Sequence, residues 1–221
     1  MNATPDGAIV LAGGVGRRLG GVDKAALVVG SRTLLQVALA SVPGIPVVVV
    51  GPAHDGTDAT FVQEDPPGGG PAAGLAAGLA ALLPLLRKSP SPGPGDPSAP
   101  AGVRVPGAAK ADGLLVAVLA VDQPGVTSRT LHRLVRAVPD GRNAGAVLTS
   151  RGRRQYAAAV FPAVALAAAV AARASWHGVA LRVLVDPLVG AEVPADGDEA
   201  RDVDTPDDLA YWRESRATGD R

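Results

Sequence analysis

Residues 8–24 read AIVLAGGVGRRLGGVDK and decide how the rest of the chain is interpreted. A short apolar run, residues 8–11, leads directly into a segment with five glycines. Glycine lets the backbone approach a phosphate closely and turn its N–H groups toward it. Arg17, Arg18 and Lys24 add cations that suit phosphate oxygens. The segment lacks the Gly-Lys-Ser/Thr of a P-loop and the glycine spacing of a dinucleotide fingerprint, so it predicts a phosphate-binding turn of another kind.

Strand-like and helix-like segments alternate through the rest of the chain. Continuous apolar runs such as PVVVV at 46–50 are typical of strands buried on both faces. We predict strands over 8–11, 46–50, 61–63, 114–121, 144–149, 155–161 and 200–203. We predict helices over 33–41, 70–86, 128–138, 163–175 and 206–215, while 179–185 fits either a helix end or a strand. This alternation predicts an α/β fold with a mostly parallel sheet covered by helices on both faces.

Length and composition limit the classes of function. The 221 residues suit a single domain spanning 1–221, within which the Pro/Gly-rich segment 87–112 is expected to be a mobile insertion. A net charge of zero argues against nucleic-acid binding and against a basic membrane surface. The absence of Cys excludes a thiolate metal site and a disulfide framework. No signal peptide precedes the first strand, so we expect a soluble cytoplasmic protein.

Acidic residues follow several of the predicted strands. Asp122 comes at the end of the strand 114–121, where open α/β sheets bind ligands. Asp202 and Asp204 precede the last helix, and Asp65 precedes a Pro-Pro pair. Each could equally be a turn or capping residue when considered alone. A metal bound by them would be a hard cation such as Mg²⁺, because its ligands would be oxygen atoms.

Four motifs taken together resemble the molybdenum cofactor guanylyltransferases, within the wider group of Rossmann-like nucleotidyltransferases. The first is the pattern LAGG-x-G-x-R-x-GG-x-DK over residues 11–24. The others, in the same order as in the family, are EDPPGGGPAAG at 64–74, AVDQP at 120–124 and DVDTPDDL at 202–209. The resemblance implies a three-layer nucleotidyltransferase fold. It also implies transfer of GMP from GTP to a molybdopterin-type acceptor, with Mg²⁺ as cofactor.

The same resemblance implies roles for individual residues. Arg18 and Lys24 neutralise the triphosphate, and Asp122 holds Mg²⁺ with Asp204, or with Asp202, as its second carboxylate. The nucleotide is contacted by Leu11, Ala12, Gly13, Gly14, Lys24, Asp65 and Asp122. Molybdoenzymes or cofactor-biosynthesis proteins are the implied protein partners.

Three alternatives stay open at the level of sequence. The guanylyltransferases often carry an Asn in the region after the strand 46–50, whereas residues 50–54 of this chain read VGPAH, so a molybdopterin cytidylyltransferase or a sugar-phosphate nucleotidyltransferase fits as well. A non-catalytic nucleotide-binding protein that delivers cofactor is a third reading. The basic turn RGRR at 151–154 suits either an acceptor phosphate or solvent.

Overall fold

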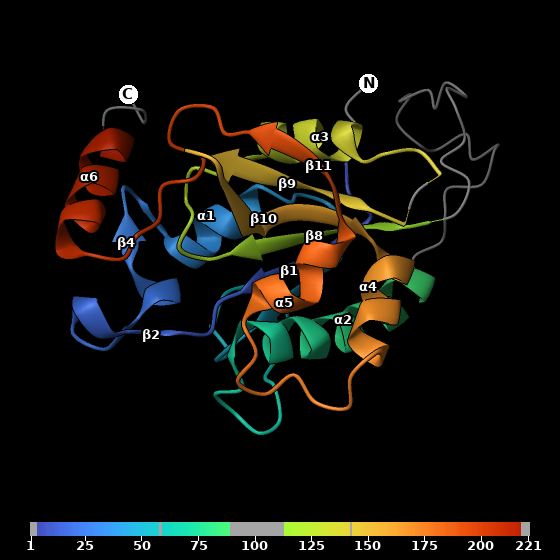
Figure 1. The fold of residues 1–221 in the computed structure, drawn as a ribbon. Coiled ribbons are helices and arrows are strands. Elements are labelled where there is room, and N and C mark those ends of the chain that lie inside the picture. Colours follow the sequence, from blue (N-terminus) through green and yellow to red (C-terminus); the bar gives the residue numbers. More distant parts are fainter. Residues whose placement is uncertain (1–3, 58, 89–112, 142, 218–221) are drawn as a thin grey trace, which may run out of the picture.

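The computed structural model describes residues 4–57, 59–88, 113–141 and 143–217. Its centre is a seven-stranded sheet with the order β11-β9-β10-β8-β1-β6-β7 (Figure 1). The strands are β1 (Gly7–Leu11), β6 (Val47–Val50), β7 (Thr60–Val62), β8 (Leu115–Ala120), β9 (Gly145–Ser150), β10 (Arg153–Pro162) and β11 (Val189–Pro194). The expected α/β class, with helices on both faces of the sheet, is confirmed.

Parallel pairing dominates the sheet. Strand β1 pairs in parallel with β6 and β8, β6 with β7, and β11 with β9. Strand β10 runs antiparallel to both of its neighbours, β8 and β9. Strands β1, β6 and β8 therefore end at the same edge of the sheet, and the loops that follow them are brought together there.

Two hydrophobic layers enclose the sheet (Figure 1). One layer contains α1 (Leu34–Ala40) and α3 (Ser128–Ala137), whose leucines face the sheet. The other contains α2 (Gly70–Lys88), α4 (Ala163–Ala171) and α5 (Leu181–Val185). Reciprocal side-chain caps begin α1 at Thr33 and α3 at Thr127.

The remaining elements are two small hairpins, the 3-10 turns and one further helix. The hairpins, β2 (Val15–Gly16) with β3 (Val22–Asp23) and β4 (Val28–Val29) with β5 (Arg32–Thr33), lie in and just after the glycine-rich segment. The described residues also form the 3-10 turns η1 (Arg17–Leu19), η2 (Lys24–Ala26) and η3 (Asp186–Leu188). The last helix, α6 (Pro206–Ala217), packs against β4.

One predicted strand is wrong. Residues 200–203 are not a strand, and the strand near the end of the chain is β11, where Gly190, Glu192 and Pro194 are exposed and weaken the strand signal. Of the two possibilities left open for 179–185, the structure has a helix, α5. The predicted insertion 87–112 lies outside the described residues apart from 87 and 88, which end α2.

Helix α2 is long and apolar enough, by length and composition, to cross a membrane. In this fold it packs on β1 and β6, with Leu75, Leu79 and Leu82 buried against the sheet. Gly78 makes this close approach possible, because a Cβ there would lie 2.7 Å from Cγ2 of Ile9. The apolar composition of α2 is thus explained by its place in the core.

We expect Leu82→Ala to lower the free energy of unfolding by about 2–5 kcal/mol, because the fully buried side chain leaves a cavity between α2 and the sheet. Urea denaturation followed by circular dichroism measures this. The control is Val164→Ala at a half-exposed position of α4, which should change the value by less than about 0.5 kcal/mol. Equal effects of the two substitutions would contradict the packing described here.

Candidate active site

A cleft of about 620 Å³ opens at the edge of the sheet where β1 and β6 end. Its walls include Leu11, Ala12, Gly13 and Gly14, four residues that the sequence predicted for nucleotide binding. Backbone hydrogen bonds fix the start of this wall: Ala12 N donates to Val50 O (2.9 Å), and Val121 N donates to Leu11 O (3.1 Å). The volume is in the range of small-molecule sites.

Gly51 follows β6 and also lines the cleft. Its φ of +148° lies in the region that favours glycine. A Cβ at this position would lie 3.2 Å from the backbone of Ala12 and Gly13. Glycine here therefore allows the loop after β6 to lie close to the glycine-rich segment.

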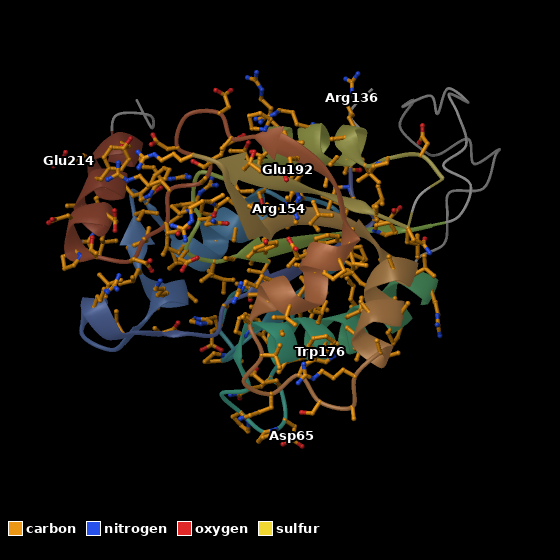
Figure 2. The ribbon with its side chains drawn as sticks, viewed as in Figure 1. Asp65, Arg136, Arg154, Trp176, Glu192 and Glu214 are labelled. Carbon is orange, nitrogen blue, oxygen red and sulfur yellow. The ribbon has the colours of Figure 1, made fainter. Side chains whose placement is uncertain are left out.

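Asp65 and Glu64 occupy different positions relative to the cleft. Glu64 lines it, and its Oε1 accepts a hydrogen bond from Gly68 N at 3.1 Å. Asp65 is exposed on the loop between β7 and α2 and is not among the lining residues (Figure 2). The predicted residue is Asp65, whereas Glu64 is the member of this pair that lines the cleft, because only the loop conformation distinguishes the two adjacent carboxylates.

Lys24 connects the two ends of the chain. Its Nζ donates to Asp122 Oδ2 at 2.7 Å and to Asp204 Oδ1 at 2.5 Å. Its side chain is 13% exposed. Burial acts to lower the pKa of Lys24, but the hydrogen bonds and charges of Asp122 and Asp204 outweigh it and raise the pKa above the ordinary lysine value. The three predicted residues thus form one cluster, which we call the Lys24 cluster.

Local bonds explain how the segment before α6 reaches β8. Val203 N donates to Asp122 O at 2.8 Å, which brings its neighbours Asp202 and Asp204 close to the end of β8. Thr205 and Asp208 then begin α6 with reciprocal bonds, Thr205 N to Asp208 Oδ2 (3.0 Å) and Asp208 N to Thr205 Oγ1 (3.2 Å). Residues 200–203 are therefore irregular rather than a strand, and Val203 links this segment to Asp122 at the end of β8.

Asp202 lies beside the Lys24 cluster but bonds to a different residue. Its Oδ1 accepts a hydrogen bond from Gln123 Nε2 at 2.9 Å, and Gln155 Oε1 lies 3.4 Å from the same nitrogen. Burial raises the pKa of Asp202, and the charges of Asp122 and Asp204 add to the increase. Of the two candidates for the second carboxylate, Asp204 is the one joined to Asp122 through Lys24.

Two predicted basic groups lie elsewhere. Arg18 is exposed in η1 and does not line the cleft. Arg154, from the turn at 151–154, binds Glu192 (Nε–Oε1 2.7 Å) and Asp186 (Nη1–Oδ1 2.6 Å). Figure 2 shows Arg154 next to Glu192, away from the loop that carries Asp65. Arg154 thus joins β10 to β11 and to the turn η3 that precedes β11.

We expect Asp202→Asn to raise the urea midpoint at pH 7, because ionisation of the half-buried Asp202 carboxyl costs free energy that Asn does not require, while Asn Oδ1 still accepts from Gln123. Because the pKa of Asp202 is raised in the folded protein, its ionised carboxyl destabilises the fold at pH 7, and this destabilisation disappears as the pH falls toward 3.8, the ordinary pKa of Asp. The difference in urea midpoint between the variant and the wild type should therefore become smaller as the pH falls from 7 toward 4.

The control for this prediction is Asp207→Asn, which removes one negative charge at an exposed position of α6. It should not raise the midpoint, since an acidic residue in the first turn of a helix is favourable. A gap for Asp202→Asn that stays constant from pH 7 to pH 4 would contradict the assigned cause.

Comparison with known proteins agrees with this geometry. A stretch of 37 residues is 62% identical to molybdenum cofactor guanylyltransferase of Acidiphilium cryptum (strain JF-5), and it spans 17% of this chain and 19% of that protein. The crystal structure of molybdopterin-guanine dinucleotide biosynthesis protein A from Archaeoglobus fulgidus is similar in fold, with a TM-score of 0.65 and 20% identity over 96% of this chain and 99% of that chain. The 2-C-methyl-D-erythritol 4-phosphate cytidylyltransferase of Thermus thermophilus is similar too, with a TM-score of 0.57 and 21% identity over 95% and 98%. Residues 8–189 match the family described as the MobA-like NTP transferase domain, so this chain belongs to that family and is a nucleotidyltransferase.

Proposed function

We propose that the protein transfers GMP from GTP to a molybdopterin-type acceptor and releases pyrophosphate. The observation that carries the proposal is the Lys24 cluster beside the glycine-walled cleft: a cation held by two carboxylates at the carboxyl end of the parallel strands. The 37-residue match to a molybdenum cofactor guanylyltransferase supports the choice of base and acceptor.

In the proposed reaction an oxygen of the acceptor's phosphate attacks the α-phosphorus of GTP. The new O–P bond forms as the bond between the α-phosphorus and its bridging oxygen to the β-phosphate breaks, and pyrophosphate carries away that electron pair. The protein forms no covalent bond in this step. Its contribution is to position the two phosphates and to neutralise the charge that develops on the leaving group.

Each residue then has a chemical task. The backbone of residues 11–14 would hold the nucleotide, since glycines let its N–H groups come close to the ligand. Lys24 and Arg18 would supply positive charge to the triphosphate. We assign the contact to the nucleoside to Asp65 or to the neighbouring Glu64, because a carboxylate accepts well from ribose hydroxyls and from guanine N–H groups.

Asp122 and Asp204 would hold Mg²⁺, which would polarise the phosphates and neutralise charge when bound. The residues present fit this ion, because two carboxylates that share one ammonium form an oxygen-donor set of the kind that Mg²⁺ prefers. In the described part of the chain no cluster of three or more His, Cys, Asp or Glu residues is arranged to hold a metal ion. Phosphate oxygens and water would supply the other ligands, as is usual for Mg²⁺.

A molybdopterin cytidylyltransferase or a sugar-phosphate nucleotidyltransferase is the second candidate, favoured by the absence of Asn from residues 50–54, a region where the guanylyltransferases often have one. The test measures pyrophosphate release with GTP, CTP, ATP and UTP, each with and without molybdopterin. Release that needs both GTP and molybdopterin supports the proposal. Release with CTP moves the assignment to the cytidylyltransferase, and no release with any pair of substrates would refute nucleotidyl transfer to molybdopterin.

We expect Asp122→Asn to lower kcat by about 100-fold or more, because it removes a charge that the proposed metal and Lys24 both use. The measurement is steady-state pyrophosphate release at saturating substrates. The control is Asp198→Asn, which changes a carboxylate bonded to Tyr211 outside the Lys24 cluster and should keep kcat within about twofold. Full activity of Asp122→Asn would exclude Asp122 as the metal ligand.

A further inference from the structure

A contact between two loops involves Asp23, one of the residues that line the cleft. His54 lies in the loop after β6, and its Nε2 is 3.0 Å from Asp23 Oδ2 in β3. The His54 side chain is only 21% exposed, and its Nε2 atom is buried. The approach has the distance of an ion pair without the alignment of a hydrogen bond. On its other side the imidazole is near the ring of Phe61 in β7, with 6.2 Å between ring centroids.

Asp23 is held at both carboxylate oxygens. Oδ1 accepts a hydrogen bond from Ala25 N at 2.9 Å and caps η2, the turn that begins at Lys24. Oδ2 faces His54. The backbone direction at Lys24 is therefore coupled to His54 through a single carboxylate.

The charge of this region makes the contact relevant to substrate binding. Asp23 and Glu64 both line the cleft, and two carboxylates in its wall would repel a triphosphate. His54 is the basic partner that the described residues provide for Asp23. It turns the Asp23 carboxylate toward the loop after β6 and compensates its charge when protonated.

We propose that His54 is a positioning residue for the nucleotide, which acts through Asp23 on the loop that carries Lys24. The inference rests on the proposed function, since the ligand it concerns is a nucleoside triphosphate. His54 makes no contact with reacting atoms in this arrangement. Its loss should weaken triphosphate binding and leave the chemical step largely intact.

The first experiment separates KM from kcat in pyrophosphate release. His54→Leu should raise KM for the triphosphate about tenfold and keep kcat within about twofold. His54→Gln places an amide N–H near the position of Nε2 and should restore most of the wild-type KM. His132→Leu, on α3, which packs on β9, β10 and β11, is the matched control and should leave both constants unchanged.

A double-mutant cycle with Asp23→Ala tests the route. If His54 acts through Asp23, the KM of the double variant for the triphosphate should be no higher than that of the worse single variant. Effects of the two substitutions on KM that multiply would overturn this route. A fall in kcat with an unchanged KM in His54→Leu would overturn the positioning role.

The second experiment needs no catalysis. Hydrogen exchange of the ligand-free protein should become faster at the amide of Ala25 in His54→Leu, and not in His54→Gln or His132→Leu. Unchanged exchange overturns the proposal, even if His54→Leu loses activity. If exchange at Ala25 is faster in His54→Leu but the wild-type protein turns over no triphosphate, the two loops are coupled and the proposed function is refuted. If His54→Leu does not fold, His54→Gln carries the test: exchange and KM like wild type support the proposal, and exchange as fast as in Asp23→Ala overturns it.

Discussion

The rest of the site depends on one shared ammonium group. Lys24 Nζ lies between Asp122 and Asp204, and without it two carboxylates would face each other in a half-buried place. The Lys24 ammonium compensates the charges of both carboxylates. Burial acts to lower the pKa of Lys24, but its bonds to Asp122 and Asp204 raise that pKa above the ordinary lysine value, so the ammonium keeps its charge. The Lys24 cluster therefore places one positive and two negative charges beside the cleft that the glycines line.

The sheet could be predicted well from the sequence because its central strands carry a strong signal. The VVVV of β6 and the LVAVLA of β8 are continuous apolar runs, and such runs occur where both faces of a strand are covered. The edge strand β11 was missed for the opposite reason, since half of its residues face solvent and glycine and proline interrupt it. Residues 200–203 looked like a strand because Val203 is apolar, but that side chain is buried next to β8 without a ladder of its own.

Several residues of the candidate site could be predicted from the sequence, but the contacts between them could not. Lys24, Asp122 and the acidic pair at 202 and 204 were recognised from motifs, because their residue types suit phosphate and metal. That Lys24 binds both Asp122 and Asp204 depends on how the last helix packs, over a separation of 180 residues, and no local pattern contains this. The same limit applies to Glu64 and to His54. Their roles follow from loop conformations that bring 64 toward the cleft and 54 toward Asp23.

The bond between Val203 N and Asp122 O ties the completeness of the site to the C-terminal part of the chain. Asp204 reaches Lys24 because the segment before α6 lies against the end of β8. A change that displaced this segment would leave the glycine residues of the cleft in place, since they follow β1 and β6. Lys24 would then keep only one of its two carboxylate partners, Asp122.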